Sequence, residues 1–402
     1  IVGESTPVCA RRQTRDSCRR MQSQTHMGLA HAGQAEVISG HMQANSNVTA
    51  DLFRNTIASG ETLILAGGYL FEVERRGYLT AGEFVPKVSI DHPEVLRQVT
   101  RDFVRAGSDI ALAFTYNGHR EKMRIIGEEH LLEPLNRHAL QIAREVAEEE
   151  TKECGRPIFM AGNISNSNIY DPDDPDSADA VRAMYREMVT WAKEEGAHLI
   201  LAETMYYYEE AKIALEEIQR VGLPAIVNVA VFATGELRDG VTPGDACRRL
   251  AGDGAEVVGT NCFRGPATMA PVLNDIATSA PDTPKCAMPV AFRTSHEHPT
   301  FFNLPDSGNT AELPHDRTFP DALEAQLANR YEMRDFARLA ADTGFQVIGV
   351  CCGGSVIHHR AVAEALGREP YLSTYSPDMS KHFMYGDDSS LKNQNSAFGG
   401  KA

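Results

Sequence analysis

Cys262, Cys351 and Cys352 are the residues whose types and spacing point most directly to chemistry. Cys262 follows the apolar run 257–261, and the adjacent pair Cys351 and Cys352 ends a second apolar run and precedes two glycines. Neighbouring cysteines rarely form a disulfide with each other and often bind a metal. Three thiolates that leave one coordination position open form a catalytic zinc site, at which a substrate thiol can exchange. The alternative is that all three are small buried side chains.

The other cysteines show no comparable pattern. Cys154 falls in a polar loop, Cys247 in a helical stretch and Cys286 before an expected strand, so we expect each to be structural. The sequence holds 8 cysteines in 402 residues at scattered spacings, unlike a disulfide framework. This usage predicts a reducing compartment, such as the cytoplasm.

Short β-type runs alternate with amphipathic helical segments through most of the chain, which is typical of a parallel sheet with crossover helices. The expected strands are residues 62–65, 110–115, 157–161, 199–203, 225–229, 257–261, 290–293 and 347–351. The expected helices include residues 92–106, 131–149, 178–195, 208–221, 245–251 and 325–343. This pattern predicts an α/β fold, the closed (β/α)8 barrel of TIM type. An open doubly wound sheet is the alternative, although no G-x-G-x-x-G fingerprint supports it.

A barrel of parallel strands would place the active site at the C-terminal ends of its strands. Two of the expected strands end in the three cysteines, which strengthens the metal interpretation. We expect the barrel to span residues 49–375, with a disordered or targeting extension at residues 1–48 and a C-terminal tail at residues 376–402.

Composition narrows the classes of partner. The formal net charge is -16, and no Lys/Arg block follows residue 50, so a nucleic-acid partner is not expected. No apolar run reaches the roughly 18 residues that a membrane span needs. A small-molecule substrate fits this composition best.

The first 41 residues allow two interpretations. They are rich in arginine and poor in acids, like an organellar transit segment, but Met42 could equally be the natural start of the protein. We therefore expect a cytoplasmic protein, with organellar import if residues 1–41 are genuine.

Residues from about 60 to 375 resemble the homocysteine S-methyltransferase family, and within it the betaine-homocysteine methyltransferases. The resemblance lies in the sequences GGYLF (67–71), ERRGY (74–78), DHPE (91–94), RAGS (105–108), AE (202–203), GTNC (259–262) and GVCCGG (349–354). It implies that Cys262, Cys351 and Cys352 bind zinc and that homocysteine sulfur takes the open position. Coordination to zinc would deprotonate a thiol of pKa about 8.5 and so supply the nucleophile.

The resemblance also suggests residues that hold homocysteine. Glu203 matches the glutamate that holds the amino group, and Gly67 and Gly68 match a glycine pair where the backbone approaches the substrate closely. Thr115, Asn117 and Asn261 are further candidates to face homocysteine. His358 and His359 follow the cysteine pair, but a fourth protein ligand would close the coordination sphere. We therefore expect these histidines to pack in the core or to form hydrogen bonds at a helix end.

Some residues depart from the family pattern. Ala66 stands where the family has an aspartate, so either affinity for homocysteine falls or another acid substitutes. Phe84, Asn117 and Thr204 align with the aromatic residues of the methyl-donor site, so the cage that holds a quaternary ammonium by cation–π attraction is altered. We name Phe84, Tyr116 and Thr204 as candidate donor-binding residues. The other candidates are the aromatic residues Tyr69, Phe114, Phe263 and Tyr206 to Tyr208, and Arg264 and Arg293 for a donor carboxylate.

The sequence thus predicts a zinc-dependent enzyme that transfers a methyl group from glycine betaine or a related betaine to homocysteine, giving methionine. A sulfonium donor, S-methylmethionine or dimethylsulfoniopropionate, is the alternative within the same chemistry. A barrel that has lost catalysis and serves as a binding or structural protein is the alternative from another class, motivated by Ala66. The long C-terminal arm that builds the dimer of mammalian betaine enzymes is not recognisable here, so we do not carry that dimer over. A homo-oligomer formed through other surfaces is the alternative.

Overall fold

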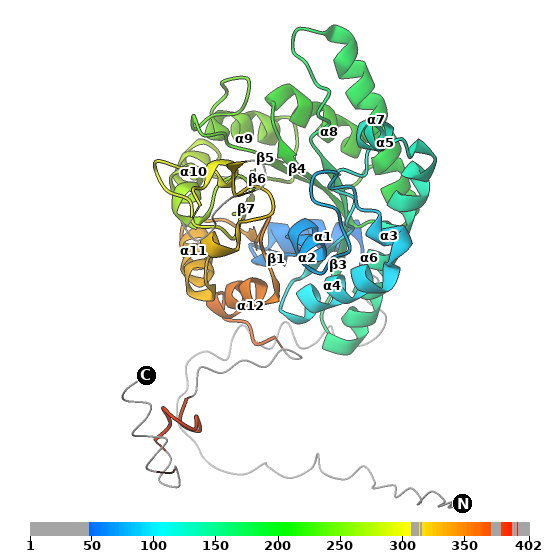
Figure 1. Cartoon of the computed structure of the whole chain (residues 1–402). Coiled ribbons are helices and arrows are strands. Elements are labelled where there is room, and N and C mark those ends of the chain that lie inside the picture. The colour runs from blue at the N-terminus through cyan, green and yellow to red at the C-terminus, as the bar shows by residue number, and fades with distance from the viewer. Residues whose placement is uncertain (1–47, 307–312, 314–315, 371–378, 388–391, 393–402) are drawn as a thin grey trace, which may run out of the picture. The chain divides into compact units, whose positions relative to one another are not determined.

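The computed structural model describes residues 48–306, 313, 316–370, 379–387 and 392. Within them, eight parallel strands close into a barrel in the order β1 to β8, and β8 pairs back with β1. Helices surround the strands (Figure 1). The predicted (β/α)8 barrel is therefore confirmed. The predicted N-terminal extension, and most of the predicted C-terminal tail, lie outside the described residues.

The strands and helices agree with most of the expected segments. The strands are β1 (Leu63–Leu65), β2 (Ile110–Leu112), β3 (Phe159–Ser165), β4 (Leu199–Met205), β5 (Ala225–Val229), β6 (Val257–Asn261), β7 (Lys285–Met288) and β8 (Val347–Gly349). The helices are α1 (Ala50–Ala58), α2 (Tyr69–Arg75), α3 (Val88–Asp91), α4 (Pro93–Arg105), α5 (Arg120–Ile126), α6 (Leu132–Cys154), α7 (Pro175–Glu194), α8 (Tyr208–Arg220), α9 (Pro243–Gly252), α10 (Pro266–Ser279), α11 (Arg330–Asp342) and α12 (Val356–Ala365).

The seventh strand differs from its predicted position. The apolar run 290–293 was the expected strand, but β7 is Lys285–Met288, so Cys286 lies inside it rather than before it. Lys285 starts the strand because its ammonium group can leave the barrel wall and donate to the carbonyls of Ala280, Pro281 and Thr283. A charged residue at a strand end is tolerated when its donors are satisfied.

Helix α11 begins later than expected. The predicted helix 325–343 starts at Arg330 in the structure, because Leu327 forms an antiparallel bridge with Phe292. Asn329 then caps the helix, and Glu332 completes a capping box by accepting a hydrogen bond from the Asn329 backbone. The bridge and the cap therefore set the start of the helix at Arg330, although the preceding residues follow a helical pattern.

Burial explains why the strands lack the alternation of an exposed sheet. Every residue of the eight strands is buried, because side chains fill the barrel on one face and helices cover the other. Helix α4 shows the complementary pattern, with Leu96, Val99 and Phe103 buried at three- and four-residue spacing. The core is therefore continuous from the barrel interior to the inner faces of the helices.

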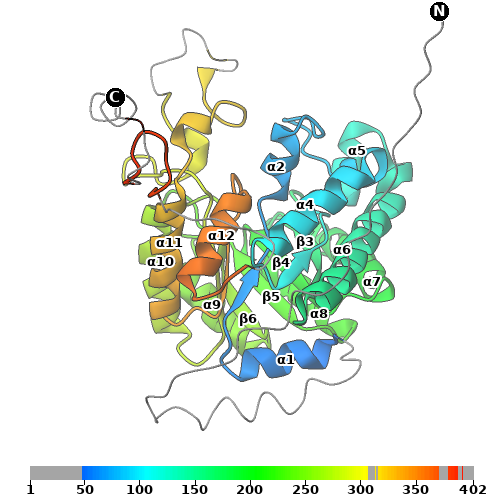
Figure 2. The same ribbon diagram turned by 90° about the horizontal axis from the view of Figure 1, so that it is seen from below.

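Helix α1 lies across the end of the barrel opposite α2 (Figure 2). Phe53 packs edge-on against Phe159 at the start of β3, with ring centroids 5.4 Å apart. Gln346, just before β8, donates to the backbone carbonyl of Ile57, and Arg54 pairs with Glu256, just before β6. These contacts join the N-terminal ends of several strands and leave their C-terminal ends free for a site.

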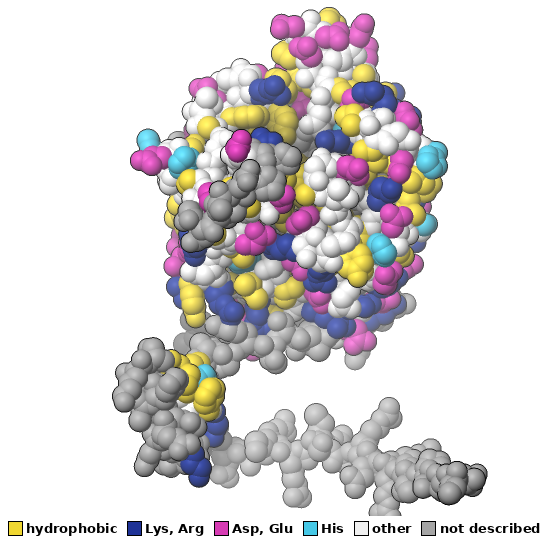
Figure 3. Space-filling model, in the orientation of Figure 1, with side chains coloured by type: hydrophobic (Ala, Val, Ile, Leu, Met, Phe, Trp, Pro, Cys, Tyr) yellow, Lys and Arg dark blue, Asp and Glu magenta, His cyan; other side chains and the backbone are white. Residues whose placement is uncertain are grey.

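On the face that Figure 3 shows, acidic and basic side chains are interspersed and form no single charged patch. Across the described residues, no helix combines the length and apolarity needed to cross a membrane.

His198 makes the stability of the barrel depend on pH. Its Nδ1 accepts the Met160 N–H at 2.8 Å, and burial lowers its pKa from 6.5 to about 4. The folded protein therefore holds this imidazole neutral, so the stability it contributes is present above pH 6.5 and is lost as pH falls towards 4.

We expect His198→Asn to reduce this pH dependence, because the Asn Oδ1 can still accept the Met160 N–H but does not titrate. Between pH 7.5 and 4, the free energy of unfolding should fall by about 3 kcal/mol less in the variant than in the native protein. Urea unfolding at several pH values measures the difference. The exposed His130→Asn variant is the control, and equal pH dependence in all three proteins would contradict the assignment.

Candidate active site

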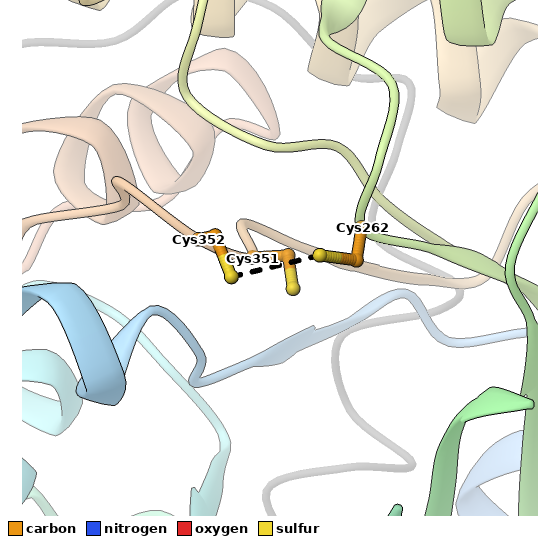
Figure 4. A group of neighbouring side chains, drawn as sticks. All are labelled: Cys262, Cys351 and Cys352. Atoms are coloured by element: carbon orange, nitrogen blue, oxygen red, sulfur yellow. Dashed lines mark hydrogen bonds between the residues drawn. The ribbon is translucent and has the colours of Figure 1, made fainter. Parts of the chain in front are cut away.

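The three cysteines lie together at the C-terminal end of the barrel. Cys262 directly follows β6, and Cys351 and Cys352 follow β8, on the other side of β7. Their sulfur atoms lie within 4.8 Å of one another, and the sulfurs of Cys262 and Cys352 are 3.5 Å apart (Figure 4). Cys262 and Cys351 are buried and Cys352 is half-buried. Three sulfur ligands in this arrangement could hold a metal ion.

The cysteine cluster favours one thiolate when no cation is present. Burial raises the pKa of Cys262, but hydrogen bonds from the Cys351 and Cys352 thiols outweigh that effect and lower it to about 5. The same hydrogen bonds to Cys262 hold the pKa values of Cys351 and Cys352 well above the usual range. Ionising all three sulfurs therefore requires a bound positive charge, which a metal ion supplies.

Backbone strain collects where these strands end. Cys262 and Phe263 have φ values of 62° and 60°, Thr204 after Glu203 has 59°, and Asn117 has 60°. A β-branched residue such as Thr204 rarely adopts positive φ, and such conformations persist only where the surroundings impose them. Each of these residues lies at the C-terminal end of a strand or in the loop that follows it.

The Asn261 side chain holds three of these strand ends together. Its Oδ1 accepts the Thr204 N–H at 2.7 Å, which fixes the strained backbone of β4. Its Nδ2 lies 2.8 Å from Glu203 Oε2, 2.9 Å from Thr204 Oγ1 and 3.6 Å from Cys351 Sγ. The family resemblance suggests that Asn261 faces homocysteine. In the structure its amide joins β4, β6 and the residues that follow β8.

Glu203 places a carboxylate in the interior without a basic partner. It is 5% exposed, and none of the described residues forms an ion pair with it. Asn163 Nδ2 donates to Oε1 at 2.7 Å and Asn261 Nδ2 donates to Oε2. Burial, followed by the electrostatic effect of the nearby Cys351, raises the pKa of Glu203 to about 8. A buried carboxylate in this setting is suited to bind a cationic group of a ligand.

Glu203, Cys351 and Cys352 open onto one pocket, whose space free of protein atoms is about 400 Å³, part of it open to solvent. Among the described residues that line it, Glu203 is the only charged side chain apart from the cysteines. The lining consists of Gly67, Gly68, Tyr69, Leu70, Leu112, Phe114, Tyr116, Asn163, Glu203, Cys351 and Cys352. The lining therefore combines apolar and aromatic side chains with one carboxylate and two cysteine sulfurs.

Gly67 and Gly68 line the pocket and also let β1 approach the cysteine loop. A Cβ at Gly67 would lie 2.4 Å from the Val350 carbonyl oxygen, and one at Gly68 would lie 3.0 Å from that of Cys351. Gly68 has φ of 87°, the left-handed conformation that glycine adopts without strain. Both glycines are required by the packing of the 350–354 loop.

Thr115 and Asn117 lie in the loop after β2 and are buried. Thr115 Oγ1 donates to the Asn163 carbonyl at 2.6 Å, and Asn117 Nδ2 donates to the Phe84 carbonyl at 3.2 Å. Neither residue is among those that line the pocket. Their side chains therefore stabilise the loops around the pocket wall.

Of the three candidate donor-binding residues, one lines the pocket and two do not. Tyr116 lines the pocket, whereas Phe84 packs against Phe71 with ring centroids 6.0 Å apart, and Thr204 is fully buried against Asn261. Tyr69 and Phe114 also line the pocket, and their rings stack 5.7 Å apart. A second aromatic group near the cysteines consists of Tyr206, Phe232, Phe263 and Phe302.

The two candidate arginines are engaged elsewhere. The Arg264 guanidinium donates to the carbonyls of Val231 and Phe232, and Arg293 pairs with Glu332 at 2.7 Å. Neither is among the described residues that line the pocket, so the lining offers no cation for a donor carboxylate.

The two histidines after the cysteine pair make structural hydrogen bonds. His358 Nε2 lies 2.8 Å from the Ala328 carbonyl, and His359 Nε2 lies 2.9 Å from the Gly67 carbonyl. The group of described residues that could hold a metal contains the three cysteines and neither histidine.

Asn163 is the polar residue of the pocket lining that sequence reasoning missed, along with the apolar Leu70 and Leu112. It lies in the middle of β3, is 3% exposed, and binds Glu203 directly. The expected third strand ended at residue 161, so the sequence pattern did not place this amide inside a strand, where it must find partners in the barrel interior.

Three comparisons with known proteins agree with this arrangement. A family model described as homocysteine S-methyltransferase matches residues 63–366. A betaine–homocysteine S-methyltransferase 1 of Danio rerio is 31% identical over 333 residues, which cover 82% of this chain and 78% of that protein. An S-methylmethionine–homocysteine S-methyltransferase of Rattus norvegicus is 30% identical over 337 residues, covering 82% of this chain and 84% of that protein.

A solved structure shows the same fold. The metallated form of the homocysteine methyltransferase MmuM from Escherichia coli aligns with a TM-score of 0.61 and 20% sequence identity, covering 77% of this chain and 98% of that chain.

We expect Asn261→Ala to lower the free energy of unfolding by about 3 kcal/mol, because it leaves the Thr204 N–H and the Oε2 atom of Glu203 without their buried partner. Asn228→Ala is the matched control, since Asn228 is equally buried on β5 but its Nδ2 contacts only the sulfurs of Cys286 and Met288. Urea unfolding measures both. A loss for Asn261→Ala no larger than that for Asn228→Ala would show that the amide does not hold the strand ends.

Proposed function

The chain belongs to the homocysteine S-methyltransferase family, and from this premise we propose that it transfers a methyl group from a small onium donor to homocysteine, giving methionine. The observation that carries the proposal is the convergence of Cys262, Cys351 and Cys352 beside the buried, unpaired carboxylate of Glu203. The sulfurs suit a metal that binds a thiol, and the carboxylate suits the ammonium group of an amino acid.

The donor set fits zinc. Thiolate sulfur is a ligand that Zn²⁺ prefers, and three protein ligands leave a position for substrate. Cys262, Cys351 and Cys352 would hold the ion. When bound, it would supply the positive charge that keeps a substrate thiol ionised at neutral pH.

The pocket residues would position the two substrates. Glu203 would bind the ammonium group of homocysteine, while Gly67 and Gly68 would let the backbone approach the amino acid closely. Tyr116 and the other aromatic side chains of the lining would exclude water and offer ring faces to an onium group. Thr115 and Asn117 would support this wall from the loop after β2.

The transfer needs orientation more than acid–base catalysis. The homocysteine thiol loses its proton, its sulfur forms a bond to the donor methyl carbon, and the carbon–nitrogen bond of a betaine breaks. The electron pair stays on nitrogen, which leaves as a neutral tertiary amine, so no general acid is required. In-line alignment of sulfur, carbon and leaving atom is the main contribution of the protein.

Glycine betaine or a related betaine is the first candidate donor, in agreement with the named activity of the Danio rerio relative. The specific observation that favours a sulfonium donor as second candidate is the Rattus norvegicus relative named for S-methylmethionine. With a sulfonium the carbon–sulfur bond breaks and a neutral sulfide leaves. The aromatic lining accepts either cation, because cation–π attraction depends on charge and fit rather than on the element.

We expect purified protein to contain close to one zinc per chain and Cys351→Ala to lose most of it, because two thiolates bind the ion far more weakly than three. Elemental analysis after dialysis gives the metal content. Cys247→Ala is the control, since Cys247 is buried in α9 away from the cluster, and it should keep its zinc. Native protein without zinc would overturn the proposed metal centre.

We expect one donor of a panel to support methionine formation from homocysteine at least tenfold faster than the others. The panel comprises glycine betaine, a related betaine, S-methylmethionine and dimethylsulfoniopropionate. Mass spectrometry identifies methionine and the demethylated product of each donor. Zinc-loaded protein that forms no methionine with any of them would instead favour a barrel that binds without catalysis.

A further inference from the structure

Asn163 carries a buried acceptor atom that the protein itself does not use. Its Nδ2 donates to Glu203 Oε1 at 2.7 Å and to the Leu201 carbonyl at 3.4 Å. Both partners are acceptors, so the orientation of the amide is fixed and the other atom must be the oxygen. That Oδ1 is buried and has no hydrogen-bond partner among the described residues. Buried polar atoms are almost always paired, so an unpaired one in a pocket indicates a missing ligand atom.

The position of this oxygen places it beside the Glu203 carboxylate. Asn163 and Glu203 both line the pocket, and the amide nitrogen that binds Glu203 shares its carbon with Oδ1. Each Glu203 oxygen accepts one hydrogen bond from the protein, Oε1 from Asn163 and Oε2 from Asn261. A carboxylate has about four acceptor positions, so two remain free.

An ammonium group matches this set of acceptors. It has three N–H donors and no acceptor. The two free positions on Glu203 and the Asn163 Oδ1 make three acceptors, and no basic side chain among the described lining residues competes for them. Ala66, at the end of β1, has no side-chain acceptor to contribute.

We propose that Asn163 is a substrate-binding residue whose Oδ1 accepts a hydrogen bond from the ammonium group of the thiol substrate, next to Glu203. The inference rests on the proposed function and adds a specificity to it. The pocket selects thiols that carry an ammonium group, and Asn163 supplies the acceptor that Ala66 lacks. A neutral amide serves this purpose without placing a second negative charge beside Glu203 and the cysteines.

The test compares two thiols that differ only in the amino group. Homocysteine and 4-sulfanylbutanoate are assayed as methyl acceptors with zinc-loaded protein and saturating donor. We expect Asn163→Ala to lower kcat/KM for homocysteine by about tenfold or more, chiefly through KM, because a hydrogen bond to a charged group is lost. For 4-sulfanylbutanoate the change should stay below about threefold.

Asn166→Ala is the matched control, because Asn166 is also buried with an unpaired Oδ1 but lies beyond the end of β3 and is not among the pocket residues. This variant should change kcat/KM for homocysteine and for 4-sulfanylbutanoate by the same factor. If Asn163→Ala fails to fold, Asn163→Ser replaces it, since its shorter hydroxyl keeps the site polar and should show the same loss of discrimination.

A second experiment, in the Glu203→Gln variant, distinguishes two roles of Asn163: direct contact with the substrate and positioning of Glu203. In Glu203→Gln protein, Asn163→Ala should still reduce the preference for homocysteine over 4-sulfanylbutanoate, and no further reduction would overturn direct contact. Equal losses on both thiols would also overturn it. If the native protein neither binds homocysteine nor forms methionine, the proposed function fails; native turnover with an unaffected Asn163→Ala variant rejects this inference alone.

Discussion

Negative charge without a basic partner is the constraint on which this site depends. Three cysteine sulfurs and the Glu203 carboxylate gather at one end of the barrel, and among the described pocket residues none is basic. Burial makes the Glu203 carboxylate harder to ionise, and hydrogen bonds to Cys262 do the same for the Cys351 and Cys352 thiols, so the pKa values of all three groups are raised. The protein alone does not balance this cluster, so its ligands must bring positive charge, which we propose to be zinc and a substrate ammonium group.

The barrel holds these groups together at the strand ends, where the backbone adopts strained conformations that neighbouring side chains stabilise. Thr204 and Cys262 adopt left-handed conformations that their side chains disfavour, and Asn261 fixes the first of them through its amide. The same amide binds Glu203, so the carboxylate and the strained backbone of β4 are held by one residue on β6. Rigid strands and a shared polar contact thus keep the carboxylate and the sulfurs in register, which a transfer reaction governed by alignment requires.

The two ends of the barrel serve different purposes. At the N-terminal ends, Phe53 and Arg54 make contacts that join several strands and stabilise the core. At the C-terminal ends, the glycine pair before α2 lets the 350–354 loop approach β1 closely, and the pocket forms beside that contact. The contacts at the N-terminal ends therefore serve stability, whereas residues at the C-terminal ends both hold the strand ends together and form the pocket.

The sequence by itself determined the barrel, because eight β/α units leave few alternatives, and it identified the three cysteines, because strand ends converge in such a fold. It misplaced the seventh strand, since residues 290–293 resemble a buried strand more than residues 285–288, which begin with the charged Lys285. The tertiary structure alone decided that Asn261 joins strand ends, that Arg264 and Arg293 are engaged elsewhere, and that Asn163 faces Glu203. These facts depend on side-chain contacts between distant segments, which local patterns of residue type do not encode.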